Sequence, residues 1–414
     1  MSEVAPIYPP FGSIGTQDDA LSQLLTPEYR ANPHPLYRRL REEAPVHRSG
    51  AAEWVFSRHS DVVSVLRHPG LGRPPQLSLP VEALQILLRM FLLLDPPDHT
   101  RQRAVVAPFF TASYIEARRA RVTAIVDELL AAVPPSEPID LIGDYAYPLP
   151  VRVISEMLGV PGEDAEQFTR WSRAMVVGLD PEQMEPAHLV GLLEAAQEFV
   201  DYVRGLAAQR RRHPRPDDLL TTMVEAVDTE ELSEEELISI CVLLLIAGHE
   251  TTVNLVGNGA LTLLRHPDQL QRWRDKEVPT RAAVEELLRY EPPISRTARV
   301  AHTDVDIGGV TVRQGEMVVA LMAAANRDPA VFGDPDGLDL GRSPNPHASF
   351  GHGIHFCLGA ALARVEGQVA LEALVTRFPS LRLDTVEPHW KSSLVLRGLA
   401  SLAVVTGEPA AASP

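Results

Sequence analysis

Cysteine is nearly absent from this sequence, which has 414 residues and only two cysteines, Cys241 and Cys357. Two cysteines are too few for the disulfide framework of a small secreted protein. The opening residues, MSEVAPIYPPFGSIG, show no basic segment followed by an apolar one, so we expect no signal peptide. The apolar runs LQILLRMFLLL and LISICVLLLIAG are shorter than the roughly 20 residues that a bilayer requires. These absences predict a reduced, cytoplasmic protein with no membrane association.

Positive charge is also scarce. The chain has 38 Lys and Arg against 55 Asp and Glu, which gives a formal net charge of −17. Proteins that bind nucleic acid are usually basic, so this composition disfavours such a partner. We find no internal repeat or low-complexity block before the terminal GEPAAASP, and we predict a single domain over residues 1–408 with a disordered tail at 409–414.

Helical periodicity dominates the pattern. Apolar residues recur every three or four positions in residues 112–133 and 191–212, as expected for amphipathic helices. Strand patterns are short and few, at residues 53–57, 305–320 and 401–407, and Gly308-Gly309 between β-branched residues predicts a hairpin. The fold class is therefore mainly α, a large helical domain with small peripheral β-sheets.

One helix should be long and central. Ser233 and Glu236 fit a capping box at its start, and about 30 residues at 1.5 Å each would span roughly 45 Å. The first part is apolar on all sides, which is typical of a buried helix. Its middle then becomes polar, over Gly248–Asn254. Because buried polar groups and weak helix formers are costly in a core helix, we interpret this stretch as functional.

A glycine-rich loop, FGHGIHFCLG at residues 350–359, contains Cys357 just before a predicted helix at 358–378. A lone cysteine is most often a buried structural residue. Zinc ligation with His352 and His355 would be oddly spaced, and a hydrolase nucleophile with His355 as base lacks further support. The fourth interpretation is an axial thiolate, since glycines let a flat macrocycle approach the backbone and the helix N-terminus lowers a thiol pKa.

The same loop resembles the haem-binding signature of the cytochrome P450 family, F-x-x-G-x-H-x-C-x-G. Phe350, Gly353, His355, Cys357 and Gly359 fill every position of that pattern. The resemblance extends from NPHPLYRRLREEAPV to the C-terminal strand. It implies the cytochrome P450 fold and heme b, iron protoporphyrin IX, whose iron is ligated by the Cys357 thiolate.

Two further motifs agree with this resemblance. AGHETT, in the polar part of the long helix, is similar to the family's oxygen-activating stretch, which implies that Glu250 and Thr251 deliver protons and are the catalytic residues. The small Ala247 leaves room for dioxygen. The sequence EELLRY contains Glu286-x-x-Arg289, which in this family is a buried structural pair, and we expect Arg342 as its third partner.

The resemblance also implies which residues contact the cofactor. Four side chains are expected to pair with the haem propionates: His99, Arg103, Arg299 and His355. Arg296 lies close enough to Arg299 that the register could differ. Further contacts with the cofactor are expected from Ala247, Phe350, Gly351 and Gly359.

The substrate is expected on the distal side, among residues 76–94, 171–184, 243–248, 292–297 and 393–396, with contacts from Leu243, Ala247, Ile294 and Leu394. The stretch VVGLDPEQMEPAH is expected to link two helices of a mobile lid. With no reductase segment, the chain resembles bacterial monooxygenases that receive electrons from ferredoxin and ferredoxin reductase, docked through Arg101 and Arg364.

The implied activity is insertion of one oxygen atom of O2 into a C–H or C=C bond of a hydrophobic small molecule, with secondary metabolites as the prior expectation. Two alternatives remain open at this point. The first is a haem-thiolate protein that acts as a peroxygenase or as a recruitment factor without oxygenation. The second is a cysteine hydrolase that uses Cys357 and His355.

Overall fold

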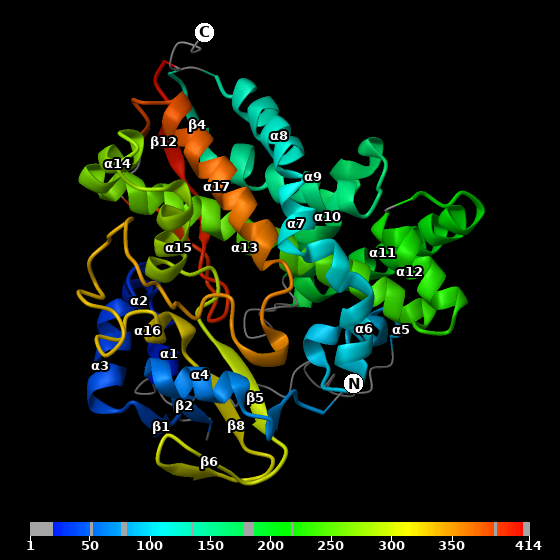
Figure 1. Cartoon of the computed structure of the whole chain (residues 1–414), viewed down its shortest axis with the longest axis horizontal. Coiled ribbons are helices and arrows are strands. Elements are labelled where there is room, and N and C mark those ends of the chain that lie inside the picture. Colours follow the sequence, from blue (N-terminus) through cyan, green and yellow to red (C-terminus); the bar gives the residue numbers. More distant parts are fainter. Residues whose placement is uncertain are drawn as a thin grey trace.

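The computed structural model describes residues 20–49, 53–75, 81–134, 136–176, 186–216, 218–384 and 387–408. Helices form most of it (Figure 1). The shorter helices of the N-terminal half are α1 (Ala20–Gln23), α2 (Pro27–Ala31), α3 (His34–Glu43), α4 (His59–Arg67), α5 (Glu82–Leu87), α6 (Asp98–Val106) and α7 (Ala112–Glu116). They are followed by α8 (Arg119–Ala131), α9 (Pro148–Met157), α10 (Ala165–Val176), α11 (Pro186–Arg212) and α12 (Leu219–Asp228). The remaining helices are α13 (Glu234–Arg265), α14 (Pro267–Arg274), α15 (Thr280–Tyr290), α16 (Met322–Ala325) and α17 (Ala360–Arg377).

The strands form small sheets at the periphery. The largest has the order β1-β2-β8-β5-β3 and lies below the helices in Figure 1. Its strands are β1 (Val46–Arg48), β2 (Trp54–Phe56), β3 (Leu71–Gly72), β5 (Thr297–Ala301) and β8 (Met317–Ala320). The others pair β4 (Pro138–Asp140) and β9 (Arg382–Leu383) with β12 (Ala403–Val405), β6 (Val305–Ile307) with β7 (Val310–Val312), and β10 (His389–Trp390) with β11 (Leu399–Ser401).

Helix α13 runs through the centre of the molecule, and α17 crosses beside it (Figure 1). The capping box is present: Glu236 N donates to Ser233 Oγ at 3.1 Å, and Ser233 N donates to Glu236 Oε2 at 2.8 Å. By length and composition α13 could cross a bilayer, but 83% of its most apolar 18-residue window is buried inside the structure. That burial identifies α13 as the core helix of a large apolar cluster.

The sequence patterns predicted the main helices and strands, and the prediction was wrong for one helix. Gly308 and Gly309 have φ values of 59° and 82°, and they join β6 to β7 as the predicted hairpin. The periodic stretch 112–133 is two helices instead of one, because the chain turns between Glu116 and Arg119. Periodicity persists across such a break, since both helices bury residues against the same core. The predicted lid stretch and the tail at 409–414 fall largely or wholly outside the described residues.

Candidate active site

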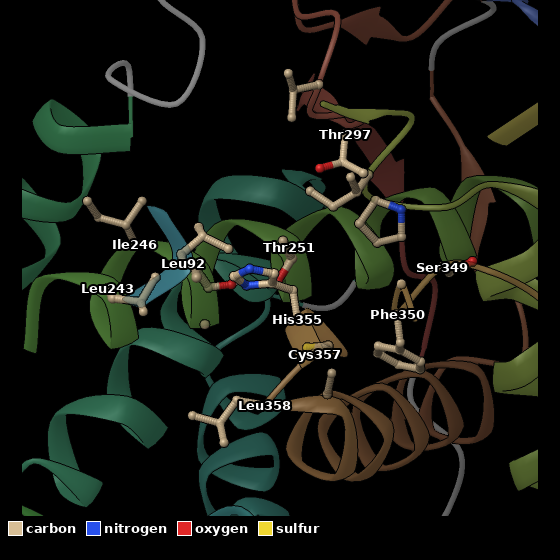
Figure 2. A pocket seen from close by; sticks show the side chains of 18 of the residues that line it. Leu92, Leu243, Ile246, Thr251, Thr297, Ser349, Phe350, His355, Cys357 and Leu358 are labelled. Carbon is tan, nitrogen blue, oxygen red and sulfur yellow. The ribbon is translucent and has the colours of Figure 1, made fainter. Parts of the chain in front are cut away.

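One pocket lies between α13, the loop before α17, β5 and residues 90–93. Figure 2 shows Cys357 near the start of α17, with Thr251 and Leu243 projecting from α13 on the other side. Many of the predicted site residues line this single pocket: Arg103, Leu243, Ala247, Thr251, Ile294, Arg299, Phe350, Gly351, His355, Cys357 and Gly359. Residues that are far apart in the sequence therefore meet where the resemblance implied.

The loop that carries Cys357 needs its glycines. Gly351 and Gly353 have φ values of 68° and 72°, in the left-handed region that favours glycine. At Gly353 a Cβ atom would also come within 2.5 Å of the carbonyl oxygen of Leu66. The amide of Cys357 donates to Phe350 O at 2.9 Å, which closes the loop. This backbone holds the cysteine at the start of α17 and at the edge of the pocket.

Burial raises the pKa of the Cys357 thiol in the protein alone. The lowering that the sequence predicted from the amides at the helix start is present as one contribution. A hydrogen bond from the Gly359 amide and the positive charges of Arg103 and Arg364 act to lower the pKa, but burial outweighs them. A thiolate at this position therefore needs an additional positive charge, which a bound metal ion would supply.

Cationic and imidazole groups gather on one side of the pocket. Burial lowers the pKa of Arg299 to about 9, and burial together with Arg73 lowers that of His355 to about 2. His99 does not line the pocket; its ring lies 4.4 Å from that of His355. Both ring nitrogens of His99 and Nε2 of His355 are buried without a hydrogen-bond partner among the described residues. Within the described residues the imidazole nitrogens of this cluster thus lack hydrogen-bond partners, and the nearest carboxylate to His355 Nε2 that forms an ion pair with it is Asp95, at 4.0 Å.

Sequence reasoning missed one member of this cluster. Arg73 lines the pocket and acts on Arg299, His99 and His355. It lies in GLGRPP, just after β3, where no helical spacing or motif distinguished it from a surface arginine. The amide of Arg73 donates to Asp95 Oδ2 at 2.8 Å, which fixes the backbone at this point.

The polar turn of α13, residues 247–252, presents different side chains to different neighbours. Thr251 lines the pocket, and its Oγ1 donates to Ala247 O at 2.8 Å. Glu250 does not line the pocket; its side chain is 4% exposed and forms an ion pair with Lys391, just after β10. Lys391 Nζ also donates to Asn254 Oδ1 at 3.3 Å. In this conformation Glu250 therefore connects the polar turn with the protein surface.

A second buried carboxyl group lies behind the polar turn. Glu366 of α17 lines the pocket and accepts a hydrogen bond from Thr252 Oγ1 at 3.2 Å. Burial raises the pKa of Glu366 to about 8, so this carboxyl is largely protonated at neutral pH. Its position in the amphipathic pattern of α17 gave no sequence signal for a pocket residue.

The Glu286-x-x-Arg289 pair is buried as predicted. Arg289 Nε donates to Glu286 Oε2 at 2.8 Å, and both side chains are 0% exposed. Arg342 Nε joins them at 3.1 Å from Glu286 Oε2, as expected of the third partner. Arg289 also donates to the carbonyl oxygens of Asn326, Pro335 and Gly337. The network thus fixes the irregular chain that leads to the cysteine loop.

Only some of the residues predicted to contact the substrate line the pocket. Leu243 and Ile294 line the pocket, but Leu394 does not. Leu394 is buried in a separate apolar cluster with Val319 and Leu321, and the neighbouring Val395 and Leu396 line the pocket instead. Residues 391–398 form an irregular segment with bends at Leu394 and Val395, so no side-chain period indicated which of them face the pocket. Of the predicted segments, residues 76–80 and 177–184 lie outside the described residues.

The two arginines expected to dock an electron donor have carboxylate partners within the chain. Arg101 Nη2 lies 2.8 Å from Asp98 and 2.5 Å from Glu236. Arg364 Nε lies 2.5 Å from Glu285, and its guanidinium stacks over the ring of Phe350 at 4.4 Å. An acidic partner at either arginine would compete with these internal carboxylates.

Comparison with known proteins decides the family. The family model for Cytochrome P450 matches residues 55–278 and 276–398. The chain belongs to the cytochrome P450 family. It is 40% identical over 388 residues to 6-deoxyerythronolide B hydroxylase of Saccharopolyspora erythraea, covering 89% of this chain and 94% of the other. It is 41% identical over 389 residues to the vitamin D(3) 25-hydroxylase of Pseudonocardia autotrophica, covering 91% and 94%.

A solved structure agrees with these relatives over the same length. P450BioI, in complex with an acyl carrier protein ligated to hexadec-9Z-enoic acid, has a TM-score of 0.86 and 38% identity, covering 92% of this chain and 100% of the other. The cytochrome P450 fold predicted from the sequence is confirmed. The chain is a cytochrome P450 monooxygenase, an oxidoreductase of a family whose bacterial members act in secondary metabolism. The hydrolase alternative is thereby excluded.

The residues present fit the haem that this family implies. The unpartnered imidazole nitrogens and the arginines on one side suit two carboxylates, and open space lies beside Gly359, two residues after Cys357. The described part of the chain contains no group of three or more His, Cys, Asp or Glu side chains placed to hold a metal ion. A single thiolate together with a macrocycle is therefore the better match than zinc.

Proposed function

We propose that this cytochrome P450 holds heme b through Cys357 and inserts one oxygen atom of O2 into a C–H or C=C bond of an apolar natural-product intermediate. The observation that carries the proposal is the shared pocket, which combines a half-buried cysteine, a cluster of cations and a threonine on the central helix. When bound, the haem supplies the activation of dioxygen and the transfer of one oxygen atom.

The side chains of this chain have separate tasks in the proposal. Arg103, Arg299, His355 and, through its contact with His355, His99 hold the propionates, and we add Arg73 to this group. Phe350 begins the cysteine loop and lines the pocket, and the small Gly351, Gly359 and Ala247 would leave room for the cofactor. The two propionates would bring negative charge to the three arginines, which offsets part of the cost of burying them.

Proton delivery is assigned to Glu250 and Thr251. Thr251 Oγ1 lies in the pocket, where it can hold a water molecule or pass on a proton. Glu250 pairs with Lys391, which is 28% exposed, so it can exchange protons with the surface. To serve Thr251, the carboxylate must leave Lys391 and turn toward the pocket. The two residues then form a path from solvent to the reacting oxygen.

The pocket lining supports an uncharged, mainly aliphatic substrate. Side chains from residues 90–93, α13 and the segment 293–294 are almost all apolar, with Leu92, Leu243 and Ile246 visible in Figure 2. Among the described residues that line the pocket, Glu366 is the only one with a carboxylate. An ammonium group on a substrate would therefore lack a counterion there. Relatives are named for a macrolide precursor and for vitamin D(3), both large and apolar.

The experiment is turnover with ferredoxin and ferredoxin reductase as electron donors, on substrates first selected by a shift of the haem Soret band. Wild-type protein should form oxygenated product with electron consumption that matches it. Thr251→Ala should still bind haem and substrate but release most electrons as hydrogen peroxide. Thr251→Ser, which keeps the hydroxyl, is the matched control. Product formation that does not change in Thr251→Ala would contradict the proton assignment, and product formed only with added peroxide would favour a peroxygenase.

A further inference from the structure

The polar turn of α13 is anchored by other parts of the molecule. Four side chains follow one another, and only the hydroxyl of Thr251 bonds to the helix itself. The other three each bond to a different element: His249 to Ser172 of α10, Glu250 to Lys391 beside β10, and Thr252 to Glu366 of α17. Neighbouring elements therefore hold this turn from several sides.

The turn has little rigidity of its own. Gly248 is a poor helix former, and nothing lies within 4 Å of the position that its Cβ would take. The bond from Thr251 Oγ1 to the carbonyl oxygen four residues earlier is of a kind that bends helices and weakens them slightly. Contacts with other elements must then determine how the turn is rotated about the helix axis.

The contact between α10 and α13 is buried. Ser172 Oγ lies 2.7 Å from His249 Nδ1, and both residues are 0% exposed. The imidazole ring packs edge-on against Tyr147, with ring centroids 4.1 Å apart. Burial, then Lys391 and Arg173, lower the pKa of His249 to about 3, so the ring is neutral at physiological pH. The bond joins two neutral groups, and a hydrogen bond lost at a buried site leaves a partner unsatisfied.

We propose that His249 is a positioning residue: its hydrogen bond to Ser172 fixes the rotation of the polar turn, so that Thr251 faces the pocket and Glu250 faces Lys391. Successive residues of an α-helix are about 100° apart around its axis, so two positions correspond to about 200°. His249 and Thr251 therefore project from nearly opposite sides of α13. A contact on the side of His249 resists rotation of the hydroxyl out of the pocket. The inference rests on the proposed roles of Thr251 and Glu250.

The test uses variants matched in shape. His249→Asn places an oxygen where Nδ1 lies, and His249→Leu has the same branching without a polar atom. Ser172→Ala removes the bond from the other side. In turnover, Ser172→Ala and His249→Leu should each lower the amount of product formed per electron consumed by about five-fold. This is the effect expected from the loss of one buried hydrogen bond. KM should stay within roughly two-fold, because the substrate contacts are unchanged. His249→Asn should recover most of the coupling.

The double variant Ser172→Ala/His249→Leu should be no worse than either single one, because both remove the same bond. In substrate-free protein, amides 247–252 should exchange hydrogen faster in Ser172→Ala, with an unchanged carbon monoxide difference spectrum. Should His249→Leu not fold, Ser172→Ala and His249→Asn still provide the comparison.

The inference would be overturned if Ser172→Ala formed as much product per electron as the wild-type protein. It would also be overturned if the losses of product per electron in the two single variants added up in the double variant. Faster exchange without a change in coupling would overturn it as well. Absence of product in the wild-type protein itself would instead refute the proposed function, and the exchange comparison would still decide whether Ser172 anchors the turn.

Discussion

Replacing Glu286 with glutamine tests how the fold holds the cysteine loop. Glu286 Oε1 and Oε2 each accept a hydrogen bond at 2.8 Å from Arg289. They also accept from Arg342 Nε, from Asn345 Nδ2 at 3.1 Å and from the amide of Asp339 at 3.0 Å. Glutamine keeps the shape of the side chain but removes its charge. Its amide group also turns a donor toward other donors.

The burial of the pair sets the expected magnitude. Arg289 and Glu286 are both 0% exposed, so the substitution leaves a guanidinium buried without its counterion. Breaking a buried ion pair from one side costs about 3–5 kcal/mol, a large share of the roughly 5–15 kcal/mol by which a domain is stable. The exposed pair of Glu82 and Arg204 offers a control, because Glu82→Gln should cost at most about 1 kcal/mol.

Urea unfolding of the two variants, followed by circular dichroism, measures these costs from the shift in midpoint at constant m-value. Glu286→Gln should also retain less haem after purification, because the chain held by Arg289 leads into the cysteine loop. A free energy of unfolding within about 1 kcal/mol of the wild-type value would refute the reasoning. It would mean that neighbouring groups or water compensate the buried charge.

Two further predictions concern a close contact and a carboxylate. Gly398→Ala should destabilise the protein by about 1–3 kcal/mol, because its Cβ would lie 1.8 Å from Asn254 Oδ1. Gly205→Ala, at an exposed position of α11, should instead stabilise the protein by about 0.5–1 kcal/mol. Thermal denaturation compares the two variants, and equal effects would contradict the packing argument. Burial by itself raises the pKa of Glu285, but hydrogen bonds from His347 and Arg364 outweigh this effect and lower the pKa to about 2. The stability that Glu285 contributes is then fully present above its unfolded pKa of about 4.3 and is lost as pH falls toward 2. Glu285→Gln should flatten the acid limb of the stability profile, and an unchanged limb would count against this pair.

The sequence predicted best where a pattern depends on the chain's own backbone. The capping box of Ser233, the hairpin at Gly308-Gly309 and the glycines around Cys357 are local, and each appears as expected. The spacing of Glu286 and Arg289 on one helical face indicated that the two side chains can meet, whereas their burial was implied by the resemblance to the cytochrome P450 family.

The rest depends on long-range contacts that carry no local pattern. Lys391 reaches Glu250 from 141 residues away, and Arg73 enters the pocket from a loop without a motif. Leu394 lies in an irregular segment without side-chain periodicity, and it packs in a separate apolar cluster instead of lining the pocket. The pKa of the Cys357 thiol depends on the whole fold, because burial outweighs the lowering by the Gly359 amide at the helix start.

The most direct test of the account is the carbon monoxide difference spectrum of the reduced protein. Wild-type protein reconstituted with haem should show the absorption typical of a thiolate-ligated iron, for which the family is named. Cys357→Ala should lose that band, whereas Cys241→Ala, whose buried thiol has its pKa raised by burial to about 12, should keep it. A thiolate spectrum that survives in Cys357→Ala, or wild-type protein that takes up no haem, would contradict the central claim.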